Sequence, residues 1–255
     1  MGILELDPGL RTGRPPPAPG AQPRARPVLE LRGVSRTFDG TPPVHALRNV
    51  DLTVVRGEWL AVVGPSGSGK STLLNVLGLL DRHTEGTYLL EGVDVSNLDD
   101  LARAGLRGRK IGFIFQAFHL LPYRTVEENV MLAEVYVGGS RRGRRERARA
   151  ALDRVGLLDR ADFLPTRLSG GQRQRAAIAR TLVGQPSLLL CDEPTGNLDS
   201  ASSRSVLDIF DQLSGEGLTL VVITHDEEVA SRANRRVRIV DGVLGDVESP
   251  GGYGR

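Results

Sequence analysis

A glycine-rich loop is the feature of the sequence most clearly suited to chemistry. Residues 64–71 read Gly-Pro-Ser-Gly-Ser-Gly-Lys-Ser, which matches the pattern G-x-x-x-x-G-K-[ST] in full. The glycines let the backbone fold tightly with its N–H groups turned inward toward an anion, and the helix expected to follow adds the positive end of its dipole. Lys70 can reach the β- and γ-phosphates, and Ser71 can offer a hydroxyl to Mg²⁺. The nucleotide contacts predicted here are Gly64, Pro65, Ser66, Gly67, Ser68, Gly69, Lys70, Ser71 and Thr72.

An apolar run that ends in two carboxylates predicts hydrolysis of the bound triphosphate. Residues 188–193 read Leu-Leu-Leu-Cys-Asp-Glu, which is typical of a buried strand followed by acidic side chains. At the carboxyl end of a parallel strand, Asp192 can reach a Mg²⁺ ion beside the phosphate loop. Glu193 lies one residue further, where a general base for the attacking water is needed. A solvated acidic strand end is the alternative, which the nearby phosphate loop disfavours.

A second glycine-rich segment, at 168–172, precedes a stretch of helical spacing at 173–182. Ser169 with Gly170 and Gly171 at a helix N-terminus makes another anion site. One fold rarely needs two phosphate sites for one nucleotide. We therefore expect the second site to serve the nucleotide of another copy of the chain.

Short apolar runs and helical spacings alternate around these motifs. Strands alternating with helices predict a parallel sheet covered by helices on both faces. The phosphate loop then follows a strand and opens a helix, which is the context that its chemistry requires. We expect strands at 28–34, 50–54, 59–63, 111–115, 188–191 and 219–223, and helices at 71–80, 126–137, 144–155 and 173–182.

The bulk composition is that of an ordinary soluble globular protein. The 255 residues are 40% hydrophobic and 25% charged, and a formal net charge of +2 is too small to indicate nucleic acid as a partner. The one cysteine, Cys191, excludes a disulfide framework within the chain, and we expect it to be buried. The N-terminus lacks the apolar core of a signal peptide, and no apolar run approaches the roughly 20 residues of a membrane helix.

Three segments differ from the rest in composition. Residues 1–27 are rich in Pro, Arg, Gly and Ala and predict a disordered tail, and a second short tail is expected at 249–255. The folded domain is expected between them, at 28–248. The run at 141–149 holds six arginines. We interpret it as a solvated helix face, with contact to lipid headgroups or to a partner as the alternative.

Taken together, the motifs resemble those of the ATPase subunits of ATP-binding cassette (ABC) transporters. Residues 168–172 match the signature motif of that family, Gln116 its glutamine loop, residues 197–199 its D-loop and His225 its switch histidine, in the order that the family has them. The resemblance covers roughly residues 28–245. It implies an α/β fold of the P-loop NTPase (RecA-like) class: a parallel sheet core, a small antiparallel β subdomain and an α-helical subdomain at about 117–165.

Longer strings resemble one branch of that family. Residues 79–88, 112–122 and 192–200 are similar to lipoprotein-releasing and macrolide-export ATPases, with the cell-division ATPase as a cousin. One departure is Phe38, which stands where the family usually has the tyrosine that stacks on adenine. A ring without a hydroxyl still stacks, and packing in the core is the alternative.

The resemblance also implies how the motifs act. Two copies face each other head to tail, and each ATP lies between residues 64–71 of one copy and 169–171 of the other. The implied catalytic roles fall to Glu193, which activates water, His225, which steadies the γ-phosphate, Gln116, which senses the metal and the water, and Lys70. The implied Mg²⁺ site consists of Ser71, Gln116 and Asp192, and the implied further nucleotide contacts are Phe38, Ser169, Gly170, Gly171, Gln172 and Asp199.

An integral membrane permease is the second partner that the resemblance implies. The family docks it near 117–132, where we expect Phe118, Leu120, Leu121 and Pro122 to be partly exposed. Packing within the helical subdomain is the alternative. The chain is accordingly expected at the cytoplasmic face of the cell membrane, held there by this partner, and nucleic acid is not expected as a partner.

Three functions compete at this point. The first is export or extraction of a lipoprotein, peptide or drug through a separate permease. The second is a regulatory ATPase that drives a membrane partner in cell-wall remodelling or division without transport. The third, action on DNA or ribosomes, is disfavoured because only about a hundred residues separate Ser71 from Ser169, without a cysteine cluster. The cargo depends on the permease rather than on this chain.

Overall fold

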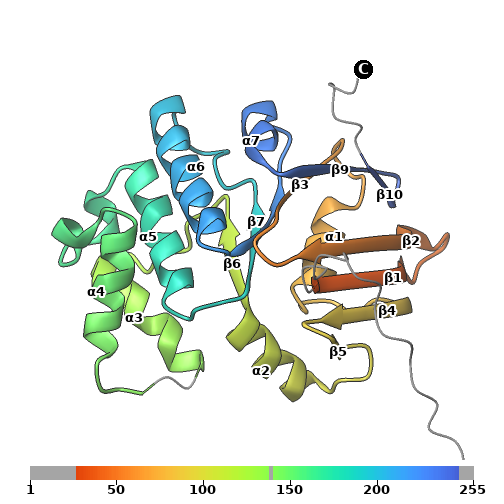
Figure 1. Cartoon of the computed structure of the whole chain (residues 1–255), viewed down its shortest axis with the longest axis horizontal. Coiled ribbons are helices and arrows are strands. Elements are labelled where there is room, and N and C mark those ends of the chain that lie inside the picture. Colours follow the sequence, from red (N-terminus) through yellow and green to blue (C-terminus); the bar gives the residue numbers. More distant parts are fainter. Residues whose placement is uncertain (1–26, 138–139, 247–255) are drawn as a thin grey trace, which may run out of the picture.

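The computed structural model describes residues 27–137 and 140–246 of the chain (Figure 1). The predicted tails, 1–27 and 249–255, lie outside these ranges except for Pro27, which begins the first strand. Within these ranges, no helix combines the length and the apolar character that crossing a lipid bilayer requires.

The central layer is a six-stranded sheet with the order β10-β9-β3-β8-β7-β6. Its inner strands are parallel, and β10 runs antiparallel to β9 at one edge. The parallel strands β3, β7 and β8 are short apolar runs, which is typical of a sheet buried on both faces. The bounds are β3 (Trp59–Val63), β6 (Ile111–Phe115), β7 (Leu188–Asp192), β8 (Thr219–Ile223), β9 (Arg235–Val240) and β10 (Val243–Asp246).

A four-stranded antiparallel sheet with the order β2-β1-β4-β5 lies beside the central sheet (Figure 1). Helix α1 (Lys70–Leu77) joins the two, because its apolar side chains share one core with side chains from both sheets. The first turn of α1 is therefore held between two rigid layers. The strands are β1 (Pro27–Phe38), β2 (Val44–Val55), β4 (Glu85–Leu90) and β5 (Val93–Asp94).

Helices cover the opposite face of the central sheet. Successive side chains of a strand point to opposite faces, so each buried strand contributes side chains to a core on either side. In β7, Leu188 and Leu190 join the core around α1, whereas Leu189 and Cys191 join a second core with side chains of α3 to α6. The helices are α2 (Asp100–Lys110), α3 (Val126–Val137), α4 (Arg144–Arg154), α5 (Gly170–Leu182), α6 (Ser200–Gly215) and α7 (Glu227–Arg232), with 3-10 turns at Leu158–Arg160 and Pro165–Arg167.

The predicted α/β architecture is confirmed, with its parallel core, its antiparallel subdomain and its helical subdomain. The predicted strands at 59–63, 111–115 and 219–223 and the helix at 126–137 have the bounds that were expected. The helix predicted at 71–80 ends earlier, at Leu77, because the backbone turns away at Gly78 and at Leu79, whose φ is 56°. Cys191 is buried as predicted, and burial raises the pKa of its thiol.

Ion pairs join α3 and α4, where the sequence predicted a solvated arginine-rich face. Glu134 and Glu127 of α3 are almost fully buried, with side-chain exposures of 5% and 7%. Buried carboxylates need charged partners, and arginines of α4 supply them. Four arginines of the run thus have a buried partner: Arg144 and Arg147 pair with Glu134, and Arg145 and Arg149 pair with Glu127. The predicted solvated face is wrong for Arg144, whose side chain is 16% exposed, but the side chain of Arg145 is 62% exposed. Sequence spacing identifies a helix face but not the helix packed against it.

We expect Glu134→Gln to destabilise the protein in a pH-dependent way. The hydrogen bonds from Arg147 lower the pKa of the Glu134 carboxyl below its ordinary value of 4.5. A carboxyl with a lowered pKa stabilises the fold above its unfolded-state pKa, and this stabilisation is lost as the pH falls through the folded-state pKa. The variant should lose about 1–3 kcal/mol at neutral pH. The loss should shrink as the pH falls below 4.5.

Urea unfolding at a series of pH values measures this difference. Glu146→Gln, at an exposed position of α4, is the matched control and should stay within about 0.5 kcal/mol of the wild type. A destabilisation by Glu134→Gln that is the same at neutral and acidic pH would contradict the role of the ion pair.

Candidate functional site

The predicted phosphate loop lies between β3 and α1 and is closed by its own lysine. Lys70 Nζ donates hydrogen bonds to the carbonyl oxygens of Gly64, at 2.9 Å, and Pro65, at 2.7 Å. The ammonium group is thus held inside the curve of the loop, at the point where an anion bound by the loop would lie.

Gly69 is the residue on which the approach of the loop to β2 depends. Its φ is 105°, and a Cβ at this position would lie 2.4 Å from the carbonyl oxygen of Ala46. Gly69 also precedes the first residue of α1, and no side chain caps that helix. The first N–H groups of α1 therefore have no side-chain acceptor there, which leaves them available to an anion.

A pocket of about 590 Å³ opens beside the loop, a size that suits a nucleotide. Phe38 lies on its wall with 39% of its surface exposed, so the alternative of core packing is wrong. The lining comprises Phe38, Val44, His45, Ala46, Arg48, Gly67, Gly69, Lys70, Ser71, Thr72, Asp241 and Gly242. Of the predicted loop contacts, those outside this lining are Gly64, Pro65, Ser66 and Ser68.

The register of the central sheet brings three other motifs to one edge. Asp192, the last residue of β7, lies beside Phe115 of β6 and Ile223 of β8. The residues that leave the sheet next to one another are therefore Gln116, Glu193 and Thr224.

Asp192 is half-buried near Lys70. Burial and the negative charge of Glu193 raise the pKa of the Asp192 carboxyl, and the charge of Lys70 partly offsets this. A divalent cation would favour the ionised form in the same way.

The donor atoms here fit Mg²⁺ delivered with a nucleotide. The Ser71 hydroxyl and the Asp192 carboxylate are oxygen donors, and proteins usually hold Mg²⁺ through one or two carboxylates together with phosphates. Over the described ranges, no group of three or more His, Cys, Asp and Glu side chains could hold a metal by itself.

The Glu193 carboxylate is held from two sides. His225 Nδ1 lies 2.7 Å from Glu193 Oε1, and Thr224 Oγ1 donates a hydrogen bond to Oε2 at 3.3 Å. The hydrogen bond with Glu193 and its negative charge raise the pKa of the His225 imidazole. The Glu193 backbone has a φ of 45°, and its N–H donates to the carbonyl oxygen of Ile223 at 3.0 Å. A carboxylate fixed in this way can orient a water molecule and accept its proton.

Gln116 is tied to the turn that follows Glu193. Gln116 Nε2 donates to Asn197 Oδ1 at 3.2 Å, and Asn197 Nδ2 donates to the backbone oxygen of Gln116 at 3.2 Å. Because Nε2 is engaged, Oε1 is the side-chain atom left to meet a metal or water.

Ser169 begins α5 and closes a reciprocal cap with Gln172. Gln172 N donates to Ser169 Oγ at 3.2 Å, and Ser169 N donates to Gln172 Oε1 at 2.9 Å. A Cβ at Gly171 would lie 2.6 Å from Ser202 Oγ, so the start of α5 packs closely on α6.

Asp199 caps α6 in a similar way. Its carboxylate accepts hydrogen bonds from Ser202 N, at 2.9 Å, and Ser202 Oγ, at 2.8 Å, and these bonds lower the pKa of Asp199. Neither Asp199 nor any residue of 169–172 lines the pocket beside the phosphate loop. The structure thus separates the predicted nucleotide contacts into two groups.

Sequence reasoning missed the pocket residues supplied by β2 and by the turn between β9 and β10. Gly242 N donates to Ser68 O at 2.9 Å, and Arg48 N donates to Gly242 O at 2.8 Å, so this turn joins the loop to β2. The dipeptide Asp241-Gly242 is a turn signal that could have been noticed. His45 and Arg48 carry no motif that would have predicted their place in the pocket.

Comparison with known proteins gives consistent results. A family model described as ABC transporter matches residues 47–196. The chain is 50% identical over 218 residues to YvrO of Bacillus subtilis, named an uncharacterized ABC transporter ATP-binding protein, and the alignment covers 85% of this chain and 95% of YvrO. It is also 50% identical over 217 residues to MacB of Rhodospirillum rubrum, a macrolide export ATP-binding/permease protein, covering 85% of this chain but only 33% of MacB.

A solved structure is similar over nearly the whole fold. It is the dimeric post-hydrolysis state of the ATP-binding cassette MJ0796, bound to ADP and Pi. The TM-score is 0.78 at 39% identity, covering 88% of this chain and 100% of that one.

We expect Gly69→Ala to weaken nucleotide binding at least about tenfold, because the added methyl group meets the Ala46 carbonyl and the backbone conformation disfavours alanine. Titration calorimetry with ADP measures the effect. Gly92→Ala is the matched control: its φ is 81°, but a Cβ there meets nothing within 4 Å. It should lower thermal stability slightly and leave ADP affinity unchanged. Equal ADP affinity in the two variants would contradict the close approach of loop and β2.

Proposed function

We propose that this chain, which belongs to the ABC transporter family, hydrolyses ATP to drive export through a separate membrane permease. ATPase activity accords with the family and with the likeness to the cassette bound to ADP and Pi. The observation that carries the proposal is the 2.7 Å contact between Glu193 and His225 at the sheet edge. Lys70 of the phosphate loop lies close enough for its charge to act on the pKa of His225.

The pocket beside the phosphate loop binds ATP in this proposal. Phe38 stacks on the adenine. Lys70 exchanges its bonds to two loop carbonyls for bonds to the β- and γ-phosphates, and the uncapped start of α1 donates its N–H groups. Ser71, Asp192 and Oε1 of Gln116 would hold Mg²⁺, which would neutralise charge on the phosphate oxygens.

Hydrolysis falls to the side chains at the sheet edge. Glu193 orients the attacking water and accepts its proton, and Thr224 and the His225 ring keep the carboxylate in place. In this proposal His225, whose side chain is 77% exposed, also contacts the γ-phosphate.

A second copy of the chain completes the site. The start of α5, with Ser169 and its two glycines, carries an anion-binding arrangement outside the pocket of its own chain. In a head-to-tail dimer, Ser169–Gly171 of one copy would face the γ-phosphate held by the other. The similar cassette MJ0796 is dimeric in its solved structure, which supports this arrangement.

The permease docks beside the segment 117–132. An apolar groove of about 310 Å³ meets this segment at its end, where Leu132 lines it together with Phe113 and Ala133. Arg180 also lines it and donates hydrogen bonds to the carbonyl oxygens of Phe118 and His119, which fixes the start of the segment. Phe118, Leu120 and Leu121 are half-buried and Pro122 is exposed, which supports this proposal, although Leu120 also packs against the core of the helical subdomain.

The cargo follows from the relatives only as a class. The MacB protein of Rhodospirillum rubrum is named for macrolide export and for both an ATP-binding and a permease part, and this chain matches 33% of its length. We assign to this chain the ATP-binding role, at the cytoplasmic face of a membrane, with a drug, peptide or lipoprotein as cargo of the permease.

Glu193→Gln should keep ATP binding and lose hydrolysis by about 10²–10⁴-fold, because the amide cannot accept the proton of the attacking water. Phosphate release and ATP affinity are measured on the same preparation. Glu227→Gln, at a side chain that is 83% exposed next to this region, serves as the control and should hydrolyse normally. Near-normal turnover by Glu193→Gln would overturn the assignment of the base.

Ser169→Arg should lower turnover by about 10²-fold or more while leaving the affinity of the monomer for ATP within about twofold, because Ser169 contacts the nucleotide of the other copy. Loss of the helix cap is expected to cost about 1 kcal/mol of stability, which a melting curve reports separately. Ser205→Arg, on the exposed face of α6, is the control. A large loss of ATP affinity in the monomer would argue against a shared site.

A further inference from the structure

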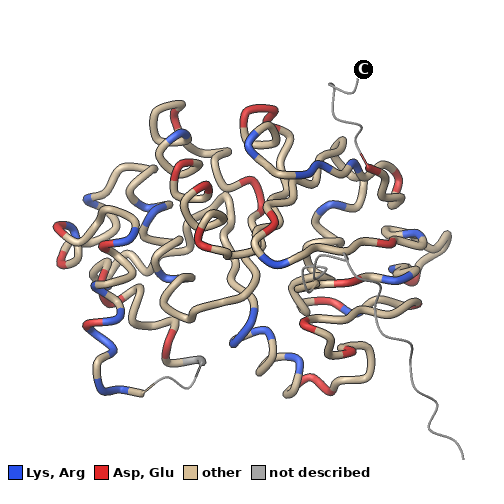
Figure 2. The backbone as a smooth tube through the Cα atoms, viewed as in Figure 1, with Lys and Arg blue, Asp and Glu red and all other residues tan. Residues whose placement is uncertain are grey.

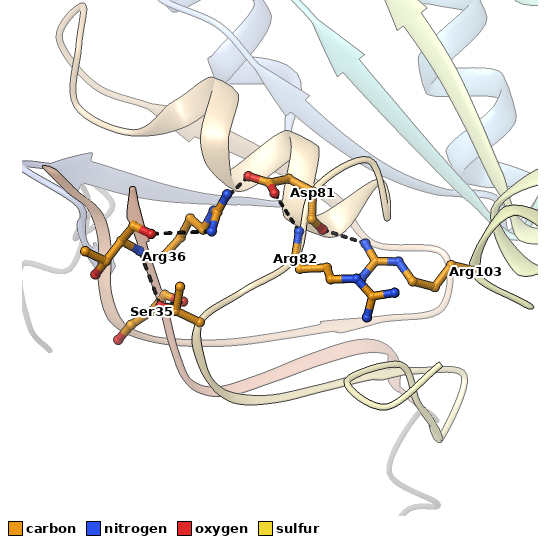
Figure 3. A network of polar contacts seen from close by, with 7 residues as sticks. Ser35, Arg36, Asp81, Arg82 and Arg103 are labelled. Atoms are coloured by element: carbon orange, nitrogen blue, oxygen red, sulfur yellow. Dashed lines mark hydrogen bonds and ion pairs between the residues drawn. The ribbon is translucent and has the colours of Figure 1, made fainter. Parts of the chain in front are cut away.

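A polar network outside the nucleotide pocket connects β1 to the end of α1 (Figure 3). Arg36 Nε donates a hydrogen bond to Asp81 Oδ2 at 2.8 Å. Asp81 is itself fixed, because Arg82 N donates to its Oδ1 at 2.7 Å and Arg103 donates to its backbone oxygen at 2.7 Å. The side chains of Arg36 and Asp81 are only 21% and 26% exposed, so solvent screens this ion pair less than a surface pair.

The Arg36 guanidinium lies over the ring of Phe38, with Cζ 4.2 Å from the ring centre. Phe38 lines the nucleotide pocket, whereas Arg36 is absent from that lining. Because the guanidinium covers one face of the ring, a base stacking on Phe38 in the pocket would meet the opposite face.

An aromatic side chain at the end of a strand can adopt more than one rotamer unless a contact restrains it. Here a cation held by a carboxylate restrains the ring through its π-face. A cation on one face also withdraws electron density from the other, which favours stacking with an electron-rich purine.

We propose that Arg36 is a positioning residue for nucleotide recognition: held by Asp81, it fixes the Phe38 ring as the platform on which the purine stacks. Asp81 follows α1, and the first turn of α1 belongs to the phosphate loop. The ion pair between Arg36 and Asp81 therefore connects the Phe38 ring, on which the base would stack, to the helix that carries the phosphate loop. This inference rests on the proposed binding of ATP in the pocket.

The test compares ADP with inorganic tripolyphosphate, which has the phosphates but no base. In the full chain, Arg36→Met should weaken ADP binding about three- to fivefold, the scale of a cation–π contact, and leave tripolyphosphate affinity unchanged. Arg36→Lys should restore part of the ADP affinity. Arg32→Met is the matched control, because Arg32 lies on the same strand, pairs with Glu30 and is 61% exposed at its side chain. It should leave both affinities unchanged.

A double-mutant cycle with Phe38→Leu separates the possible outcomes. Phe38→Leu should weaken ADP binding about tenfold by removing the stacking platform. In that background Arg36→Met should have no further effect, since Arg36 acts through the ring. If Phe38→Leu leaves ADP affinity unchanged, the proposed place of the base is wrong.

Other results would overturn the role of Arg36 alone. One is an ADP affinity unaltered by Arg36→Met while Phe38→Leu weakens it. Another is the same loss of ADP affinity from Arg36→Met with and without Phe38. A further one is an equal loss of affinity for ADP and for tripolyphosphate. The last is tighter ADP binding by Arg36→Met, which would mean that the guanidinium occupies the face that the purine needs.

Discussion

The alignment of three parallel strands is the constraint on which the rest of the site depends. Backbone hydrogen bonds place Phe115, Asp192 and Ile223 side by side, and among the residues that follow them are those we propose to act on the nucleotide. A slip of one strand by one residue would turn each of its side chains to the opposite face of the sheet. The two cores on either side of the sheet oppose such a slip, because Leu188 and Leu190 are buried on one face and Leu189 and Cys191 on the other.

Acidic and basic residues occur together in every part of the described fold (Figure 2), but they are used in different ways. At the sheet edge, burial and the negative charge of the neighbouring Glu193 raise the pKa of Asp192, and a bound cation would oppose this shift. In the helical subdomain, the buried carboxylates of α3 are instead satisfied permanently by arginines of α4. The acidic groups at the sheet edge would be stabilised by a bound cation, whereas the ion pairs between α3 and α4 hold these two helices together. Similar residue types thus serve binding in one layer and cohesion in another.

Sequence patterns predicted the elements whose signals are local. β3, β6 and β8 are continuous apolar runs, and the phosphate loop is a complete motif, so both could be read without tertiary information. β9 was missed because arginines alternate with its apolar residues, and the pocket walls at His45 and Arg48 depend on how β2 packs against the loop. α6 was an avoidable miss, since Val206, Leu207, Phe210 and Leu213 have helical spacing. The partners of the arginine-rich run required knowledge of which helices touch.

Glu193 combines a left-handed backbone conformation with the side chain proposed as the general base. With a φ of 45°, this residue adopts a geometry that glycine enters freely and that costs a residue with a Cβ about 1–2 kcal/mol. Glycine at this position would remove the conformational cost, whereas the proposed role as general base requires the carboxylate. The backbone at Glu193 is thus strained, and the contacts that Thr224 and His225 make with its carboxylate help to hold the residue in this conformation. Selection for stability and selection for the proposed hydrolysis would therefore favour different residues at this position.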